Sequence, residues 1–217
     1  MKKELLAEPM LFTGMEETEI EACLTALKAK EKTFHKGDAI LHAGDTTDTM
    51  GLVLSGSVTI ESTDVWGNRA ILSSIGKNQV FAETYALIEN QPLLVDVYAN
   101  EDCRILMLKV KTLMSLSDMP TWAIKFQKNL FAITTRKNLT LSKKCFHVSP
   151  RFIRERVLTY LNSMAIETGK KEFDIPFDRQ QLADYLNVDR SSLSKELGDM
   201  KKAGLIDTWK YHFKLLV

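Results

Sequence analysis

Cysteine is scarce in this 217-residue chain, and its three copies lie far apart. Cys23, Cys103 and Cys145 include no C-x-x-C pair, so their spacing predicts neither a disulfide framework nor a zinc or iron–sulfur centre. We expect three free thiols in a reducing compartment.

Long hydrophobic runs are also missing. No apolar segment approaches the roughly 20 residues that cross a bilayer, and the opening Met-Lys-Lys-Glu-Leu-Leu lacks the apolar core of a secretion signal. We therefore expect a cytoplasmic protein with no membrane partner. An apolar fraction of 45% in 217 residues suits one or two ordinary globular domains.

Charge of one sign is not in excess, because 29 Lys and Arg residues balance 28 Asp and Glu residues to a net charge of +1. The chain as a whole is therefore no nucleic-acid-binding polycation. Basic residues gather locally: from Lys125 to Arg156 there are nine Lys or Arg residues and one acidic residue, Glu155. A DNA-facing surface and a solvated helical face both explain such a run.

Catalytic and metal-binding motifs are absent from the sequence as well. There is no G-x-S-x-G, H-E-x-x-H or P-loop motif, and the four histidines (His35, His42, His147 and His212) are scattered. We predict that the protein is not an enzyme and has no metal site and no resident cofactor. Haem held by His35, His42 or a cysteine stays open as an alternative to a structural role for these residues.

What the sequence does contain is a pair of short helices joined by a tight turn, predicted between residues 178 and 203. Asp178 and Gln181 form a capping box that starts the first helix. Asn187 ends this helix, because asparagine tolerates the left-handed conformation that the turn requires, and Asp189 caps the second helix. The residues expected to be buried on the first helix are Leu182, Ala183 and Leu186.

The second helix presents a polar face suited to the DNA major groove. Its buried stripe is Leu193, Leu197 and Met200, at positions i, i+4 and i+7. Arg190 and Lys195 stand one turn apart on the other side, where they are suited to guanine edges and phosphates. A solvated helical hairpin is the alternative. Two apolar runs around a polar turn in residues 204–217 favour the DNA-binding role, since they predict a wing closing a winged helix-turn-helix.

The N-terminal half is predicted to be a short helical segment followed by a small β-barrel or roll. Residues 1–30 are helical in pattern, with Ile20, Leu24 and Leu27 on one face. Glycine-containing turn signals then recur from Thr33 to about Lys111. The expected strands include residues 52–54, 58–60, 70–72 and 105–108.

A helix of about 25 residues is predicted to follow, opening near Ser117–Pro120. It carries a coiled-coil-like stripe, and a second apolar stripe is formed by Ile124 and Phe131. We expect the first stripe to meet a partner subunit and the second to pack on its own domain, although the first could instead pack on its own domain. The first stripe is Trp122, Phe126, Leu130 and Ile133.

Beyond this helix we expect a linker near residues 144–149 and a further helix. Ser149 and Pro150 offer an N-cap and first-turn pair. The buried face of this next helix is expected to be Ile153, Val157, Leu161 and Met164, and Gly169 stops it.

The order of these parts resembles the cyclic AMP receptor protein/FNR (Crp/Fnr) family of bacterial transcription regulators over nearly the whole chain. The matching segments are Phe34–Asp38, Gly44-Asp45, Leu52–Gly56, Phe81–Glu83, and Gln180–Ala183 through Leu205-Ile206. The resemblance implies an α+β fold in three parts. These are a double-stranded β-roll like that of cyclic-nucleotide-binding domains (1–116), a dimerisation helix and hinge (117–146), and a winged helix-turn-helix (147–217).

The resemblance also implies which residues read DNA. Arg190 matches the family's base-contacting Arg, and Lys195 replaces a second Arg, which loses the bidentate fork. Ser191 stands where many members have a Glu that contacts cytosine, so a different half-site is expected. The full expected set, including phosphate contacts, is Arg179, Gln180, Arg190, Ser191, Ser192, Ser194 and Lys195.

The effector site departs from the family pattern. Cyclic-nucleotide binders have Gly-Glu for the ribose and, ten residues beyond the Glu, Arg-Ser for the cyclic phosphate; this chain has Ala82-Glu83 and Leu93-Leu94. Two Leu side chains would leave a buried phosphate unpaired, which costs several kcal/mol. We expect a pocket at these four residues that does not bind cyclic AMP, in which Glu83 is either a ligand contact or a surface or capping carboxylate.

These expectations add up to a homodimeric regulator that binds a near-palindromic site on double-stranded DNA and responds to an effector other than cyclic AMP, or to none. RNA polymerase is a further partner left open by the resemblance. The alternative function is a cyclic-nucleotide or other small-molecule binding module with a degenerate DNA-binding domain.

Overall fold

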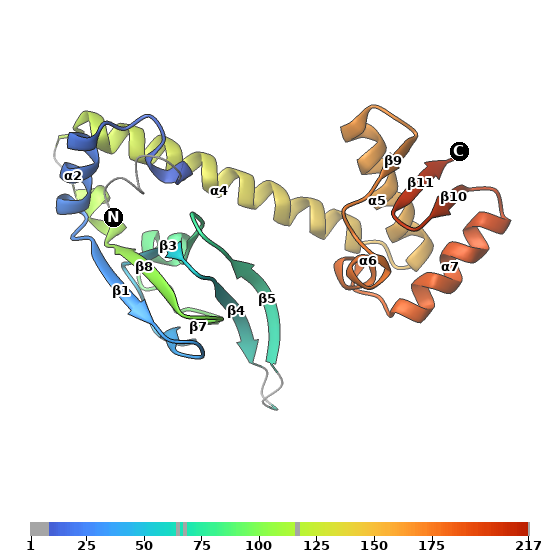
Figure 1. Cartoon of the computed structure of the whole chain (residues 1–217), viewed down its shortest axis with the longest axis horizontal. Helices are drawn as coiled ribbons and strands as arrows, with labels where there is room; N and C mark the ends of the chain where they lie inside the picture. The colour runs from blue at the N-terminus through green and yellow to red at the C-terminus, as the bar shows by residue number, and fades with distance from the viewer. Residues whose placement is uncertain (1–8, 64–65, 67–68, 116–117, 217) are drawn as a thin grey trace. The chain divides into compact units, whose positions relative to one another are not determined.

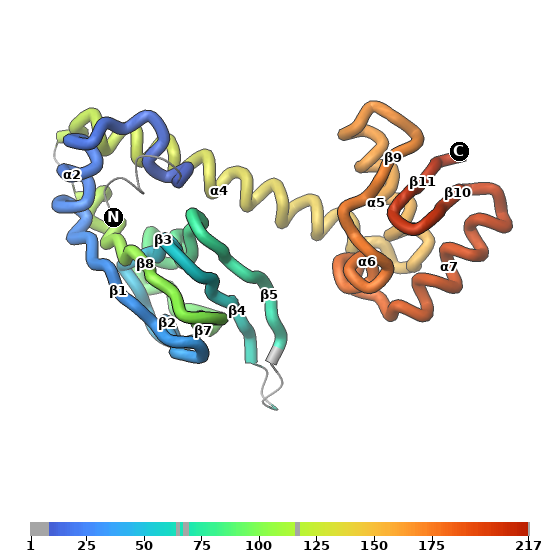
Figure 2. The backbone as a smooth tube through the Cα atoms, in the orientation of Figure 1, coloured from blue at the N-terminus to red at the C-terminus, as the bar shows by residue number. Residues whose placement is uncertain are grey.

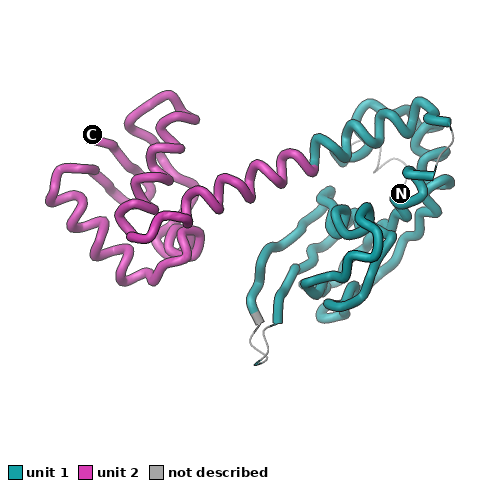
Figure 3. The backbone as a smooth tube through the Cα atoms, turned by 180° about the vertical axis from the view of Figure 1, so that it is seen from behind, with its two compact units in different colours: residues 1–133 teal, residues 134–217 magenta. Residues whose placement is uncertain are grey.

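The computed structural model describes residues 9–63, 66, 69–115 and 118–216. The chain forms two compact units, residues 1–133 and 134–217 (Figure 3). The division falls inside the long helix that the sequence predicted as a segment of its own. Ser117, where that helix was expected to open, and residues 1–8 lie outside the described part of the chain.

Unit 1 contains two antiparallel four-stranded sheets whose inner faces share one apolar core, which is the predicted β-roll (Figures 1 and 2). The expected strands at 52–54, 58–60, 70–72 and 105–108 are all confirmed, as parts of β3, β4, β5 and β8. In order across the sheet, the first contains β1 (Lys30–Phe34), β8 (Cys103–Leu108), β3 (Met50–Ser55) and β6 (Val80–Phe81). The second contains β2 (Ala39–Leu41), β7 (Asp96–Ala99), β4 (Val58–Thr63) and β5 (Arg69–Ile75).

The central strands β3 and β8 are buried on both faces. Val53 and Ile105 point into the core between the sheets, whereas their neighbours Leu52 and Leu106 point into a second core on the outer face. Side chains alternate along a strand, so burial on both sides requires the unbroken apolar runs seen here. The second core is completed by η1 (Met10–Phe12), α2 (Glu17–Ala26) and η2 (Val110–Ser115). The predicted face of α2, Ile20, Leu24 and Leu27, is buried there.

Helix α4 (Thr121–Val148) begins just after Pro120, whose carbonyl accepts from the Ala123 amide at 2.8 Å, and its first half closes the same core. Trp122, Phe126 and Leu130 are buried in it, and Ile133 packs against it. The prediction that this stripe meets a partner subunit is therefore wrong, and the alternative that it packs on its own domain holds. The reason is that the outer face of the first sheet is itself apolar and needs a cover.

The opposite face of α4 carries the second apolar stripe to solvent. Ile124 is 56% exposed and Phe131 is 72% exposed. Seven residues make nearly two helical turns, so these two side chains lie one above the other. The structure thus exchanges the roles that the sequence analysis gave to the two stripes.

Unit 2 is an α+β domain in which three helices pack against a three-stranded sheet (Figure 1). Its helices are α5 (Ile153–Thr168), α6 (Arg179–Leu186) and α7 (Arg190–Lys202), and its sheet has the order β10 (Ile206–Trp209), β11 (His212–Leu215), β9 (Glu172–Asp174). The predicted wing hairpin is β10–β11, and β9 adds a strand that the sequence analysis missed.

Two boundaries around α5 differ from the prediction. Helix α4 continues to Val148, so the linker is residues 149–152 rather than 144–149. Helix α5 starts at Ile153, four residues after the expected N-cap, because the Ser149 hydroxyl donates instead to the Phe146 carbonyl and closes α4. The predicted face of α5 is confirmed: Val157 and Leu161 are fully buried and Gly169 ends the helix at φ 68°.

Candidate nucleic-acid interface and effector region

The helix-turn-helix is built from the caps that the sequence predicted. The Gln181 amide donates to Asp178 Oδ1 at 2.8 Å, and the Asp178 amide donates back to Gln181 Oε1 at 2.9 Å. Asn187 ends α6 with φ 53°, in the left-handed region. The Ser192 amide donates to Asp189 Oδ2 at 2.9 Å and starts α7. These contacts fix where α7 begins relative to α6.

Arg156 on α5 holds the turn between the two helices, a role that the sequence analysis missed. Its guanidinium donates to the carbonyls of Leu186 (3.1 Å) and Asn187 (3.0 Å), and also to the Pro150 carbonyl at 2.8 Å. A cation at the C-terminus of a helix is also stabilised by the partial negative charge of the helix dipole there. In the sequence Arg156 was one member of the basic run; nothing local signalled that it binds carbonyls 30 residues away.

Much of that basic run is likewise engaged within the chain. Arg154 pairs with Glu196 on α7 at 2.6 Å, and Lys143 pairs with Glu167 on α5 at 2.8 Å. Lys125 pairs with Glu19 at 2.7 Å in the other unit. These members of the run therefore hold elements together within each unit.

The exposed face of α7 carries the residues expected to contact DNA. Arg190, Ser191, Ser192, Ser194 and Lys195 are all exposed, whereas the stripe Leu193, Leu197 and Met200 is buried. The Ser191 hydroxyl donates to the Asp189 carboxylate, and this bond is the main cause that lowers the pKa of Asp189. Ser191 thus extends the N-terminal cap of the helix.

A concave surface encloses a pocket of about 420 Å³ between the start of α7, the start of α6 and the tip of the wing. It brings together three cationic side chains, those of Arg179, Arg190 and Lys210, with Tyr211 beside them. Lys210 and Tyr211 form the two-residue turn between β10 and β11. The sequence predicted a polar turn in the wing without singling out either residue, because only the fold shows that this turn lines the same pocket as Arg190.

Arg179 is half-buried and ties α6 to the wing. Its Nη2 donates to Thr208 Oγ1 at 2.9 Å, and its guanidinium carbon lies 5.0 Å from the centre of the Phe213 ring. Burial lowers the pKa of its guanidinium. Gln180, the neighbouring residue, donates from its side chain to Asp184 at 2.8 Å. The structure therefore gives both residues contacts within the chain at the rim of the concave surface.

His147, near the end of α4, lies in an aromatic cluster inside unit 2. Its Nε2 lies 2.9 Å from Ser163 Oγ and its Nδ1 lies 2.8 Å from the Tyr185 hydroxyl. The Ser163 hydroxyl donates its hydrogen to the Thr159 carbonyl, so it accepts from Nε2–H, and Tyr185 donates to Nδ1. Burial lowers the pKa of His147, and both ring nitrogens are satisfied in the neutral form.

The predicted effector pocket is not assembled as expected. Ala82 adopts a left-handed conformation (φ 61°) and Glu83 is buried at the first residue of α3 (Glu83–Leu87), so it is not a surface carboxylate. Leu93 is buried, but Leu94 is 71% exposed. The chain bends at Leu94, and only Leu93 of the two leucines is buried where it can line an interior site.

The remaining candidates for metal or haem binding are separated. His35 and His42 are both exposed. Nδ1 of His35 lies 3.5 Å from Asp102 Oδ2, and Nδ1 of His42 lies 3.7 Å from Asp96 Oδ1. Cys23 and Cys103 are buried, and burial raises the pKa of Cys23 to about 12. Within the described residues, no cluster of three or more His, Cys, Asp or Glu side chains is positioned to hold a metal ion. No described helix has the length and hydrophobicity to cross a membrane.

Comparison with known proteins matches both units. Residues 31–118 match the cyclic nucleotide-binding domain, and residues 155–216 match the Crp-like helix-turn-helix domain. The chain belongs to the Crp/Fnr family of transcription regulators. Its relatives include the CRP-like cAMP-activated global transcriptional regulator of Mycobacterium tuberculosis, at 22% identity over 94% of this chain and 90% of that protein.

Other relatives of this Crp/Fnr member are similar only in part or only in fold. The voltage-gated inwardly rectifying potassium channel KCNH6 of Homo sapiens is 32% identical over 60% of this chain, which spans only 13% of the channel. The Thermus thermophilus catabolite activator protein has a similar fold, with a TM-score of 0.53 at 22% identity over 95% of this chain and 93% of that one.

The buried His147 predicts that acid destabilises unit 2. In the unfolded state His147 has an ordinary histidine pKa of about 6.5, whereas in the folded state burial lowers its pKa. As the pH falls through about 6.5, the unfolded state takes up a proton that the folded state does not, and the free energy of unfolding decreases. Calorimetry at pH 7.5 and 5.5 should show a lower melting temperature of unit 2 in acid, and a smaller shift in His147→Phe. His42→Gln replaces an exposed histidine of the other unit and is the matched control. An equal pH dependence in wild type and His147→Phe contradicts this assignment.

Proposed function

We propose that the protein is a homodimer that binds a near-palindromic site on double-stranded DNA through α7, acts as a regulator and not as an enzyme, and responds to an effector other than cyclic AMP. The observation that carries this proposal is the concave cationic surface at the start of α7. Arg190 is the first residue of α7, and the two residues that follow it, Ser191 and Ser192, have short hydroxyl side chains that leave room for a base edge.

The two ends of this surface suit different parts of DNA. The N-terminal residues of a recognition helix contact base edges in the major groove, and cations on a wing contact phosphates. Arg190 therefore carries sequence discrimination, together with Ser194 and Lys195 one turn further along. The residues that flank Arg190 position α7 on the phosphate backbone of the DNA. They are Arg179, Gln180, Ser192 and Lys210. Because Ser191 caps the helix and carries no carboxylate, the half-site differs from one read by Arg and Glu together.

Replacing Arg190 by Ala should weaken binding to the preferred site by about 1–3 kcal/mol and relax discrimination at one base pair. The preferred site is first selected from random DNA, and affinity is then measured by fluorescence anisotropy. Lys202→Ala removes the same charge at the other end of α7 and is the matched control, which should retain the site preference. Equal losses in the two variants would mean that Arg190 contributes charge alone and would overturn its base-reading role.

The exposed stripe on α4 supports the homodimer. Ile124 and Phe131 are large, exposed apolar side chains at coiled-coil spacing on a helix whose other face is buried in its own unit. Two copies of such a stripe bury each other when the helices pair about a two-fold axis. Pairing the two α4 helices also gives the two recognition helices the symmetry that a near-palindromic site requires.

Ile124→Asp combined with Phe131→Asp should convert the protein to monomers in sedimentation and abolish tight operator binding, because each charge would be buried against its symmetry partner. Ile166→Asp places a charge on an α5 side chain that is 75% exposed and should leave the dimer intact. A double variant that stays dimeric would show that the interface lies elsewhere on the chain.

Cyclic AMP is disfavoured by the chemistry of the effector region. Leu93 is buried where the family has its phosphate-binding Arg, so a cyclic phosphate there would be desolvated without a countercharge. Calorimetry with cyclic AMP and cyclic GMP should show no saturable binding in the micromolar range. Micromolar binding would instead favour the alternative function, a cyclic-nucleotide binding module; the DNA selection above then decides whether its helix-turn-helix is degenerate.

A further inference from the structure

A cavity of about 390 Å³ opens at the edge of the β-roll, outside the predicted effector pocket. Its walls are the edge strand of each sheet, β1 and β2, and one end is closed by residues 47–49 and Lys109. The floor is aliphatic, formed by Ile40, Leu41 and Met107. Its volume lies within the range of small-molecule sites, about 300–1,000 Å³.

The register of β1 shows that its lysines face this cavity. Lys30 is paired with Met107, and Lys32 with Ile105. Directly paired residues in an antiparallel sheet point to the same face, and Met107 and Ile105 belong to the core between the sheets. Lys30 and Lys32 therefore extend from the inner face of the edge strand, and Lys28 joins them at the lining of the cavity.

On the outer face of β1 the charge of Glu31 is in an ion pair, whereas Lys30 and Lys32 on the inner face form none with the described residues. Glu31 on the outer face accepts from Arg104 Nε at 2.7 Å. Among the described residues, no ion-pair partner lies within reach of Lys28, Lys30 or Lys32. Like charges held close together repel, and an anion between them removes this repulsion.

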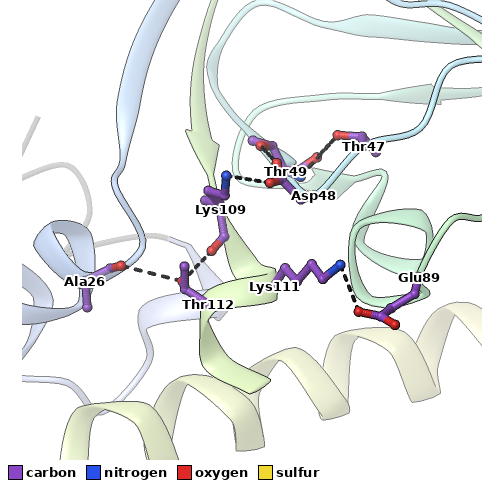
Figure 4. A network of polar contacts seen from close by, with 8 residues as sticks. All are labelled: Ala26, Thr47, Asp48, Thr49, Glu89, Lys109, Lys111 and Thr112. Carbon is purple, nitrogen blue, oxygen red and sulfur yellow. Dashed lines mark hydrogen bonds and ion pairs between the residues drawn. The ribbon is translucent and has the colours of Figure 1, made fainter. Parts of the chain in front are cut away.

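The fourth lysine holds one wall of the cavity in place. Lys109 Nζ donates to Asp48 Oδ2 at 2.6 Å, and the Thr49 hydroxyl donates to Asp48 Oδ1 at 2.9 Å (Figure 4). The Thr47 hydroxyl donates to the Thr49 carbonyl at 3.0 Å. Because Asp48 forms its ion pair with Lys109, it does not neutralise the other three lysines.

We propose that this cavity binds a small amphipathic anion, a carboxylate or phosphate attached to an apolar body. The acidic group lies between Lys30 and Lys32, and the apolar body lies on Ile40, Leu41 and Met107. Neither part suffices alone: the lysines are exposed enough for a bare ion to be hydrated instead, and the floor is too small to bind a neutral hydrocarbon strongly. Binding at this site does not depend on the DNA-binding proposal.

The probes are octanoate, octyl phosphate, octanol and inorganic phosphate, each titrated into full-length protein carrying ¹³C-methyl methionine. The Met107 methyl signal, assigned with Met107→Leu, should move in a saturable way with octanoate, octyl phosphate or both, and the stronger of the two identifies the acidic group. Octanol and inorganic phosphate should leave it unmoved. The Met200 signal, from the core of the other unit, should not respond.

Lys30→Gln combined with Lys32→Gln should weaken binding of the active probe about tenfold, since two partly exposed ion pairs each contribute modestly. Lys144→Gln combined with Lys170→Gln removes the same charge from exposed sites in unit 2 and should change nothing. Lysines on an edge strand can also act simply to prevent strand pairing between molecules. If the double variant aggregates and no probe moves the Met107 signal of the wild type, the lysines act only against strand pairing and the proposal is overturned. Binding of octanol as strong as that of octanoate or octyl phosphate also overturns the proposal.

Discussion

The packing of α4 on the outer face of the first sheet determines most of what unit 1 can do. Phe126 is fully buried there and Trp122 and Leu130 nearly so, which joins the helix to strands β3 and β8 in one core. Burial of three large side chains is worth several kcal/mol, so this face of the helix is not available for exchange with another molecule. Everything that a partner can contact on the first half of α4 must lie on the opposite side.

In unit 2 the corresponding constraint is the turn between α6 and α7. Arg156 satisfies two carbonyls of that turn from α5, and Arg154 pairs α5 with Glu196 on α7. Both basic residues therefore act on the orientation of α7 within unit 2. A guanidinium is suited to this task because its planar fork donates several hydrogen bonds in fixed directions.

The sequence was sufficient wherever the determining contacts are local. The caps at Asp178 and Asp189, the left-handed Asn187 and the buried stripe of α7 depend on residues within a few positions of one another, and the structure has each of them. The stripes on α4 could not be assigned in this way. Periodicity shows that a helix has two apolar faces, but which face is covered depends on an apolar sheet surface formed by strands far away in sequence.

The same limit explains why the effector region was only partly predicted. Leu93 and Leu94 were recognised as unsuited to a phosphate, yet their different burial depends on the path of the chain beside Asp45, whose carbonyl accepts from the Leu93 amide at 2.8 Å. Lys30 and Lys32 alternate with Glu31 and Thr33 and look in sequence like a solvated strand. Only pairing with β8 turns these lysines toward an apolar floor, because a shift of one residue would turn Glu31 inward instead. The register of β1 thus decides whether its lysines or Glu31 face the cavity at the edge of the β-roll.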